Sequence, residues 1–311
     1  MADQLDVLVA GGGIAGLSAG LTAARLGHET LILTGHLPGG NLLSIECIEG
    51  YPGHPEGIPG YVLCPAAQEQ AAAAGATFAM SEFTGLQPAG DGWLVSSSDG
   101  DHSARTVILA TGTHLRELGV AGEGRLRGKG VSNCASCDAP LLRGRPVAIV
   151  GGGDSALQEA LTLAGAASRV TILTNGDGLT AQATYRERVA AHPTIEVRRN
   201  VRVREILGDQ VVTGVRLEDF AGGQVEDLEA DGVFIYIGMA PNTAFPEGGP
   251  ALDATGYLAV DGHLRTGLAG VLAAGTVRAG SAGRAASSAG DGTMAAMAAH
   301  DYLAGGARGN K

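Results

Sequence analysis

The chain carries the same strand–turn–helix signature twice, and this duplication restricts its fold more than any other feature of the sequence. In the first copy, the apolar segment Leu5–Ala10 runs into a G-x-G-x-x-G turn at residues 11–16. In the second, the apolar residues 147–150 run into G-x-G-x-x-A at residues 151–156. Each turn predicts a parallel β-α-β unit whose helix N-terminus receives the phosphates of a dinucleotide. We therefore expect an α/β protein with two Rossmann-like dinucleotide-binding domains, the second inserted into the first.

The glycines of the first turn have separate expected roles. Gly11 makes the tight turn, Gly13 lets the backbone approach a pyrophosphate, and Gly16 lets helix and strand pack closely. The strand expected at Thr30–Leu33 runs into a threonine and a glycine, so the acidic residue that normally binds a ribose hydroxyl is missing. We expect this first cradle to bind its ribose differently or more weakly.

A C-x-x-C pair, Cys134 and Cys137, lies between the two glycine turns. Thiols at this spacing close a small disulfide that is readily reduced and reformed, which predicts electron transfer from cofactor to sulfur. A zinc site would need a second Cys or His pair, and none follows, so we expect no metal. Asp138, next in sequence, suits proton transfer with the thiols, although its position also fits a solvated turn residue. Cys47 and Cys64 are each expected to be small buried apolar side chains.

Length and charge exclude several classes of protein. With 311 residues the chain exceeds what one hydrophobic core organises, so two domains are expected. The formal charge of −11 argues against nucleic acid or an anionic membrane surface as partner. The acidic N-terminus predicts no secretory leader, and no apolar stretch reaches the ~18–20 residues that span a bilayer. Four cysteines are too few for a disulfide scaffold, and we expect a cytoplasmic protein.

Weaker patterns outline the other elements. Pro65 is expected to open an alanine-rich helix that closes at Gly75, because proline suits a first helical position. The remaining expectations are loops at 35–41 and 50–59, short strands over 77–110, a second β-α-β unit over 146–173, buried strands at 233–237 and 271–276, and a helix at 289–303.

Motifs over nearly the whole chain resemble those of the low-molecular-weight thioredoxin reductases, in the pyridine nucleotide-disulfide oxidoreductase group. A lone glycine turn is weak support, whereas a series of motifs in the family's order is specific. The family usually has Gln where this chain has Asn41. Besides the glycine turns and the C-x-x-C-D segment, the matching motifs are Pro38-Gly39-Gly40-Asn41, Glu46 with Tyr51-Pro52-Gly53, Ala110-Thr111-Gly112, residues 238–243, and Ala273-Ala274-Gly275.

The resemblance implies an FAD-binding domain at residues 1–115 and 243–311, a pyridine-nucleotide domain at residues 116–242 that carries the thiols, and a homodimer. It places Cys137 toward the flavin, gives Cys134 the attack on the partner disulfide, and makes Asp138 the general acid/base. The implied FAD-binding residues are Gly11, Gly13, Ile14, Ala15, Gly16, Gly39, Gly40, Asn41, Ala110, Thr111, Gly112, Gly275, Thr276, Arg284 and Ala285. The implied nucleotide-binding residues are Gly151, Gly153, Asp154, Ser155 and Ala156.

The segment that selects the nucleotide departs from the family. NADPH-using members hold the 2′-phosphate with a His-Arg-Arg cluster and another Arg four residues beyond, but this chain has Thr174, Asn175, Gly176 and Thr180 there. Uncharged side chains cannot replace the charge-assisted hydrogen bonds of arginine, which are worth roughly 1.5–3 kcal/mol each. Asp177 fits either a ribose hydroxyl, as in an NAD site, or a turn. Both NADH and NADPH stay open as donors.

Two further departures concern the flavin surroundings. Thr276 stands where the family has Asp, and Gly283, Arg284 and Ala285 stand where it commonly has Arg-Gln-Ala. These changes cluster on nucleotide selection and flavin environment while the thiol site is kept. The electron donor, or the direction of electron flow, can therefore differ from that of the family.

Four functions are compatible with this pattern. The first is an FAD-dependent disulfide reductase that acts on a thioredoxin-like protein or a small disulfide. The second is a dithiol oxidase that passes electrons to oxygen without NADPH, and the third is a reductase that uses ferredoxin or another flavin. The fourth is a non-catalytic flavin-binding protein, which the retained thiols and Asp138 disfavour. The intact second glycine turn favours the first.

Overall fold

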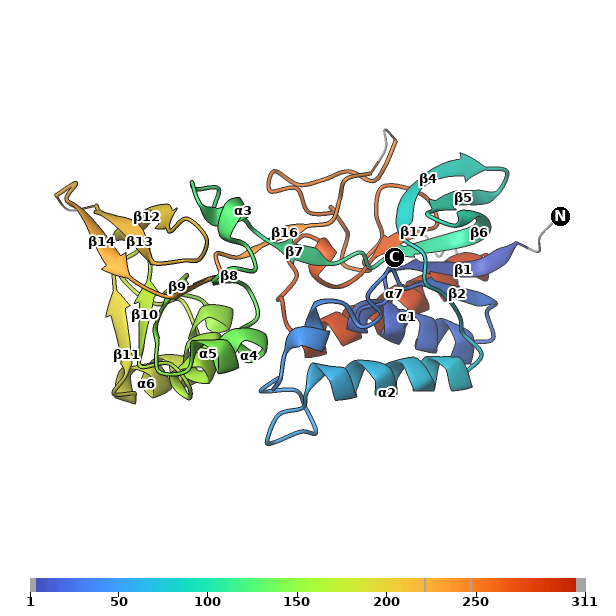
Figure 1. Ribbon diagram of the computed structural model, residues 1–311. Helices are drawn as coiled ribbons and strands as arrows, with labels where there is room; N and C mark the ends of the chain where they lie inside the picture. Colours follow the sequence, from blue (N-terminus) through green and yellow to red (C-terminus); the bar gives the residue numbers. More distant parts are fainter. Residues whose placement is uncertain (1–3, 221, 246–247, 306–311) are drawn as a thin grey trace. The chain divides into compact units, whose positions relative to one another are not determined.

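The computed structural model describes residues 4–220, 222–245 and 248–305, so residues 1–3 of the acidic N-terminus lie outside the described part. The chain divides into two compact units, one of residues 1–114 and 240–311 and the other of residues 115–239 (Figure 1). The chain passes between them through strands β7 (Thr113–Leu115) and β16 (Met239–Pro241), which pair in a two-stranded sheet. Each unit contains a parallel sheet with helices, which confirms the predicted α/β class with two Rossmann-like sheets.

The sheet of the first unit has the order β3-β2-β1-β6-β5-β4, with β17 also paired to β6. Strands β1, β2, β3, β6 and β17 run parallel, while β4 and β5 form an antiparallel extension. Its strands are β1 Leu5–Ala10, β2 Thr30–Leu33, β3 Thr77–Ala79, β4 Phe83–Ala89, β5 Gly92–Ser97, β6 Gly100–Leu109 and β17 Val271–Ala273. Its helices are α1 Ile14–Arg25, α2 Gly60–Ala73, α7 Ala285–Leu303 and the 3₁₀ turns η1 Gly40–Ser44 and η3 Gly275–Val277.

Alternation along β1 builds two core layers. Val7 and Val9 pack with α1, α2 and α7, whereas Leu8 and Ala10 pack on the side of Trp93 and the β4–β5 hairpin. This is expected because successive strand side chains point to opposite faces of a sheet. The three helices accordingly lie together along one face of the parallel strands (Figure 1).

Two helix boundaries differ from the sequence-based expectation. Helix α2 begins at Gly60 with Pro59 as N-cap, so Pro65 lies inside the helix and does not open it. The buried Leu63 and Cys64 hold this first turn against the core, and their packing outweighs the one backbone hydrogen bond that proline cannot donate. The last helix begins at Ala285, about one turn earlier than expected.

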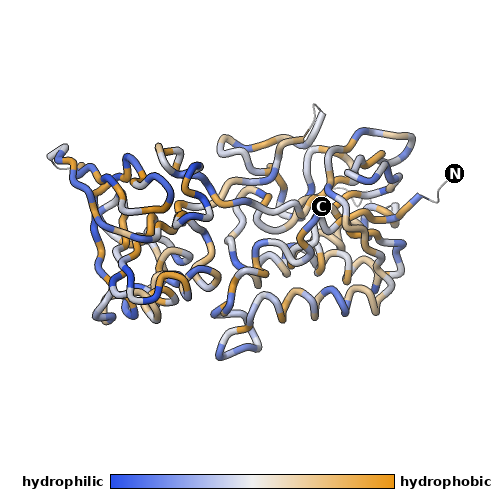
Figure 2. The backbone as a smooth tube through the Cα atoms, in the orientation of Figure 1, coloured by the Kyte–Doolittle hydropathy of each residue, from blue (hydrophilic) through white to orange (hydrophobic). Residues whose placement is uncertain are grey.

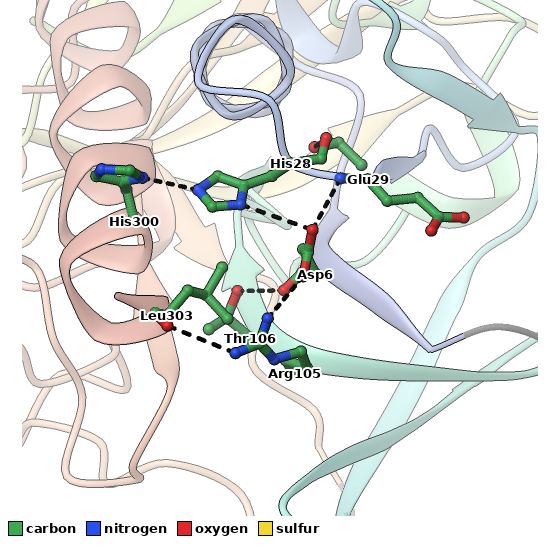
Figure 3. Close-up of polar contacts among 8 residues, drawn as sticks. Asp6, His28, Glu29, Arg105, Thr106, His300 and Leu303 are labelled. Atoms are coloured by element: carbon green, nitrogen blue, oxygen red, sulfur yellow. Dashed lines mark hydrogen bonds and ion pairs between the residues drawn. The ribbon is translucent and has the colours of Figure 1, made fainter. Parts of the chain in front are cut away.

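A polar network closes the first unit at the end of β1 opposite to the glycine turn (Figure 3). Asp6 forms an ion pair with Arg105 on β6 at 2.9 Å, and His28 lies 2.9 Å from His300 on α7 between ring nitrogens. Burial acts to raise the pKa of Asp6, but the peptide N–H of Glu29, Arg105 and His28 outweigh it and lower that pKa. The network therefore joins β1, β6 and the last turns of α7.

The second unit has a parallel sheet of order β11-β10-β9-β15-β8 and an antiparallel sheet of order β12-β13-β14. Hydrophilic residues are frequent along β14 (Figure 2). Its strands are β8 Val131–Ser132, β9 Pro146–Val150, β10 Arg169–Leu173, β11 Ile195–Arg198, β12 Val201–Leu207, β13 Gly214–Asp219, β14 Val225–Glu229 and β15 Gly232–Ile235. Its helices are α3 Glu123–Leu126, α4 Ala135–Asp138, α5 Asp154–Ala164, α6 Ala183–Ala191 and the 3₁₀ turn η2 Ala139–Leu142.

In the second unit β9 has the same two-faced role as β1. Val147 and Ile149 pack with α5 and α6, whereas Ala148 and Val150 pack on the side of β12 and β13. The β-α-β unit predicted over residues 146–173 is confirmed by β9, α5 and β10. Within the described residues of both units, no helix is long and apolar enough to cross a membrane.

Candidate active site

The first glycine turn has the geometry of a phosphate cradle. Gly11 has φ +125°, and a Cβ there would lie 2.1 Å from the carbonyl oxygen of Ala110. A Cβ on Gly16 would lie 1.8 Å from the carbonyl oxygen of Gly11, so this glycine allows α1 to pack on the turn. At Gly13 a Cβ would meet nothing within 4 Å, and α1 begins there without a side-chain cap or an acidic residue in its first turn. The helix N-terminus therefore presents free N–H donors toward open space, which fits the pyrophosphate of a dinucleotide.

Three other segments converge on this turn within the first unit. Gly39 donates its N–H to the carbonyl of Gly12 at 2.8 Å, which places the 38–41 loop beside the turn. The N–H of Ala110 donates to Ala10 at 2.8 Å, and the N–H of Ala274 donates to Leu109 at 2.9 Å. The motifs that the resemblance assigned to FAD, although spread from residue 11 to residue 276, thus meet at the carboxyl ends of β1, β6 and β17.

Hydroxyl and amide groups lie between the end of β6 and Thr276, the position at which the family has a carboxylate. The Thr276 hydroxyl lies 3.2 Å from that of Thr113, and Asn41 donates its side-chain N–H to the Thr113 carbonyl at 2.6 Å. Asn242 and Thr111 exchange two hydrogen bonds of 2.8 Å between side chain and backbone. Neutral donors and acceptors of this kind suit a polyhydroxyl chain such as the ribityl group of FAD.

A buried ion pair that sequence reasoning missed holds the Gly275–Val277 turn. Asp291, on α7, accepts two hydrogen bonds of 2.7 Å from the Arg278 guanidinium and one of 3.1 Å from the Gly275 N–H. The Asp291 and Arg278 side chains are 8% and 17% exposed, so little water shields them. The position of Thr276 therefore depends on this pair. An arginine three residues after Ala-Ala-Gly was the only sequence signal.

Removing the Asp291 carboxylate should destabilise the fold strongly. Asp291→Ala leaves the Arg278 charge buried without a partner, and we expect a loss of about 3–5 kcal/mol in the free energy of unfolding, measured with denaturant. The control is Asp231→Ala, which breaks the exposed pair with Arg145 and should cost less than about 1 kcal/mol. Equal losses in the two variants would contradict a special role for the buried pair.

The remaining residues that the resemblance assigned to FAD lie at the starts of helices α1 and α7. Ala285 packs against the cluster that contains Ile14, and a Cβ on Gly275 would lie 2.7 Å from the Cβ of Ala15. Arg284 is the exposed N-cap residue of α7. Ile14, Ala15 and Ala285 thus lie where the helices meet, while Arg284 lies on the surface.

The two cysteines of the C-x-x-C pair form a disulfide with their Cα atoms 5.4 Å apart. Cys134 is the N-cap of the short helix α4 and half-buried, whereas Cys137 is exposed. The Cys134 N–H donates to the Ser132 hydroxyl at 3.1 Å, and the Asp138 N–H donates to the Cys134 carbonyl at 3.3 Å. Asp138 is the last residue of this helix and directly follows Cys137 of the disulfide.

The other two cysteines lie in the first unit. Cys64 is buried 3.5 Å from the Gly39 carbonyl, and burial raises the pKa of its thiol to about 11, as expected for an inert core residue. Cys47 is half-buried, so the expectation of full burial was wrong for it. Its sulfur lies 3.5 Å from the Glu56 carbonyl oxygen, in the loop between η1 and α2.

The second glycine turn repeats the first with one difference. Gly151 has φ +139°, and a Cβ there would lie 2.2 Å from the Tyr236 carbonyl oxygen. At Gly153, the N-cap of α5, a Cβ would meet only the Thr180 hydroxyl, at 3.9 Å. Asp154 in the first turn accepts hydrogen bonds from the backbone and side chain of Gln182 at 2.7 and 3.0 Å. Ser155 is exposed and Ala156 is buried beneath the turn.

The segment after β10 folds back over this turn. The N–H groups of Thr180 and Ala181 both donate to the Gly152 carbonyl, at 2.8 and 3.2 Å. Thr174 is buried and Asn175 is exposed, and no cationic side chain occurs from residue 174 to 185. On the adjacent strand β11, Arg198 lies opposite Leu173 at the end of β10 and forms an ion pair with Glu226. The loop at residues 174–180 is therefore uncharged apart from Asp177.

Comparison with known proteins decides the family. The sequence profile of the family described as "Pyridine nucleotide-disulphide oxidoreductase" matches residues 5–301. The chain belongs to this family.

Its similarity extends over the whole length of individual members. The thioredoxin reductase of Treponema pallidum is 38% identical over 304 residues, which cover 97% of this chain and 98% of that protein. The thioredoxin reductase of Mycolicibacterium smegmatis is 39% identical over 300 residues, with 96% of each chain covered. The crystal structure of Lactococcus lactis thioredoxin reductase, in the FR conformation, superposes with a TM-score of 0.94 at 32% identity, covering 97% of this chain and 100% of that one.

These similarities confirm the resemblance to low-molecular-weight thioredoxin reductases. The protein is an FAD-dependent disulfide oxidoreductase of the thioredoxin reductase type, so a non-catalytic flavin-binding role is wrong. The family implies FAD and NADPH as cofactors and thioredoxin as partner.

Proposed function

We propose that this oxidoreductase passes electrons between FAD and the Cys134–Cys137 pair and exchanges that pair with the disulfide of thioredoxin or a similar small protein. The observation that carries the proposal is the closed disulfide on α4, with Cys134 half-buried and Cys137 exposed, followed directly by Asp138. We assign the unit of residues 1–114 and 240–311 to FAD and the unit of residues 115–239 to the pyridine nucleotide and the thiols.

The first unit would hold FAD through the residues that converge on the first glycine turn. The N-terminus of α1, at Gly13 to Gly16, would bind the pyrophosphate, and Thr276 and Asn41 would bind the ribityl side of the cofactor. Bound FAD supplies hydride and electron transfer chemistry that no side chain possesses. The protein's part is to bind, to orient and to keep the turn at residues 275–277 fixed through the Arg278–Asp291 pair.

At the thiol site we assign Cys134 the attack on the substrate disulfide and Cys137 the resolving role. The thiolate of Cys134 forms a mixed disulfide and releases one substrate thiolate. Cys137 then attacks Cys134, which reforms the Cys134–Cys137 bond and releases the second substrate thiolate. Asp138 is the nearest acid in sequence to protonate the leaving thiolates and to accept the proton of a thiol.

Asp138→Asn tests that assignment. The amide cannot carry the proton, so we expect disulfide turnover to fall ~10²–10⁴-fold while FAD stays bound. Turnover is followed as thiol release from thioredoxin or an aromatic disulfide, and FAD by its absorbance. The matched control is Asp209→Asn, an exposed loop carboxylate in the same unit, which should leave thiol release nearly unchanged. An unchanged rate in Asp138→Asn would return this residue to a turn role.

A second function from the same class rests on the uncharged loop at residues 174–180. Without cationic side chains there, the donor is not tied to NADPH, and a dithiol oxidase with oxygen as acceptor or a reductase fed by ferredoxin or another flavin uses the same FAD and thiols. Anaerobic incubation with NADH, NADPH or a dithiol separates these functions by which compound bleaches the flavin. Bleaching by NADH or NADPH supports the reductase, and bleaching by the dithiol alone, reversed by oxygen, supports the oxidase.

We place the protein in the cytoplasm, as its cysteine usage and N-terminus predict, and we propose a homodimer, as the family resemblance implies. Sedimentation of the FAD-loaded protein tests the second statement. A single species of one chain mass at micromolar concentration would refute the dimer.

A further inference from the structure

Tyr236 is a buried tyrosine next to the thiol segment that the proposed chemistry leaves unused. It directly follows β15, and its N–H donates to the Val150 carbonyl at 2.8 Å. The residue is 8% exposed and belongs to the same core cluster as Ala135 and Ala139, which flank Cys137 in sequence. Its backbone is therefore fixed by the central sheet, while its ring lies in the core beneath α4.

The hydroxyl of this side chain is enclosed, and its O–H has no acceptor in hydrogen-bond geometry among the described residues. Such a group costs free energy, and native structures contain few of them. Burial raises the pKa of Tyr236 far above its usual range, and the carboxylates of Glu159 and Asp138 raise it further. A hydrogen-bonding interaction of the phenol oxygen with the backbone of Ala135 lowers this pKa, but it does not outweigh the other causes. The phenol thus keeps its proton, as an O–H donor within electrostatic range of two carboxylates.

We propose that Tyr236 is a positioning residue of the Cys134–Cys137 centre whose hydroxyl donates a hydrogen bond to Asp138 once the disulfide has opened. This inference rests on the proposed function. The disulfide holds the Cα atoms of Cys134 and Cys137 at 5.4 Å and so constrains α4, a helix of four residues that ends at Asp138. Opening the bond removes that constraint. The charge of Glu159 acts on Tyr236 more strongly in the disulfide state, but Glu159 lies within α5, an 11-residue helix that the disulfide does not constrain, so opening the bond does not release it toward Tyr236.

The consequence is a bias in the thiol–disulfide equilibrium. In the disulfide state the Tyr236 hydroxyl has no acceptor, whereas in the dithiol state it has one, so Tyr236 favours the dithiol. With dithiothreitol as reductant, the protein S–S bond breaks and takes up two electrons and two protons, while the two thiols of the reagent close to its cyclic disulfide. The equilibrium constant of this exchange therefore measures the bias without any need for turnover.

The experiment compares the FAD-loaded full chain with Tyr236→Phe, Asp138→Ala, the double variant and Tyr185→Phe. Tyr185 is a buried tyrosine of the same core cluster, with its hydroxyl 3.4 Å from Gln158, and serves as the matched control. Each protein is equilibrated anaerobically at pH 7 with dithiothreitol of graded reduced-to-oxidised ratio, quenched in acid and alkylated after unfolding. Peptide mass spectrometry then gives the fraction in which Cys134 and Cys137 are both reduced.

We expect Tyr236→Phe to shift the equilibrium ~10-fold toward the disulfide, which is about 30 mV for this two-electron couple. Tyr185→Phe should stay within ~2-fold of wild type, and Tyr236→Phe should add less than ~2-fold in the Asp138→Ala background, which has no side-chain acceptor at that position. The melting temperature should be unchanged or raised by Tyr236→Phe in the disulfide form and lowered only in the dithiol form. Equal losses in both forms would reveal a merely structural role and overturn the proposal.

The other outcomes separate the inference from the proposed function. A wild-type Cys134–Cys137 pair that does not exchange with dithiothreitol overturns both. A pair that exchanges normally, with Tyr236→Phe equal to wild type, overturns the role of Tyr236 alone. A Tyr236→Phe shift that persists in the Asp138→Ala background overturns Asp138 as acceptor. The reduced-minus-oxidised infrared difference spectrum of wild type needs no variant: a tyrosine band shift is expected, and its absence contradicts the proposal.

Discussion

Cys134→Ser and Cys137→Ser are each expected to lower turnover with a protein disulfide or a dithiol by ~10⁴-fold or more while FAD remains bound. A serine hydroxyl is not ionised at neutral pH and cannot attack a disulfide, so Cys134→Ser forms no mixed disulfide and Cys137→Ser cannot resolve the one that Cys134 forms. The measurement is thiol release from the substrate, with flavin absorbance to confirm that the cofactor site is intact. Because the thiols lie in one unit and the segments that we assign to FAD lie in the other, we expect loss of activity and loss of flavin to be separable.

The control for this prediction is Cys64→Ser in the first unit. Cys64 is buried with a raised thiol pKa and has no assigned chemistry, so its substitution should affect stability but not the rate per bound FAD. Full turnover in either variant of the C-x-x-C pair would contradict a mechanism centred on that pair.

The second large expected effect is a loss of selectivity for NADPH over NADH. We expect NADPH to be preferred over NADH weakly or not at all, because two charged contacts of roughly 1.5–3 kcal/mol each are absent and ~10²–10⁴-fold of discrimination is lost with them. The measurement is the concentration dependence of anaerobic FAD reduction by the two nucleotides. Strong selectivity for NADPH in wild type would show that another cation, with Arg199 in the turn after β11 the first candidate, replaces the missing ones.

A gain-of-function variant makes this test sharper. Gly176 has an ordinary φ and a Cβ there would meet nothing within 4 Å, and Asn175 is exposed, so arginines fit at both positions. The double variant Asn175→Arg, Gly176→Arg should gain ~10²–10⁴-fold in selectivity for NADPH. The same substitutions made as lysines should gain less, since an ammonium lacks the bidentate geometry of a guanidinium.

Local motifs predicted the parts of the molecule that backbone geometry dictates. The turns at Gly11 and Gly151 need positive φ and the absence of a Cβ, which leaves an unmistakable trace in sequence. The apolar runs at Leu5–Ala10 and residues 147–150 likewise predicted the strands that became β1 and β9. The paired cysteines were recognisable because two cysteines separated by two residues can bring their Cα atoms within the distance that a disulfide requires.

What the sequence did not reveal depends on contacts between distant segments. Asp291 and Arg278 meet because α7 packs on η3, and neither residue alone signals a buried pair. In the sequence, Tyr236 resembles any other position of a buried strand. Only the structure shows that its hydroxyl is enclosed beside the thiol segment. Pro65 misled because tertiary packing of Leu63 and Cys64 outweighs the local preference of proline for a helix start.

An anaerobic reductive titration of the FAD-loaded protein tests the central claim most directly. If electrons pass between FAD and the Cys134–Cys137 disulfide, full reduction with dithionite consumes about four electrons per FAD, two for the flavin and two for the disulfide. Cys134→Ser should consume about two under the same conditions. A wild-type protein that takes up only two electrons per FAD, with Cys134 and Cys137 still joined at the end of the titration, would contradict the claim.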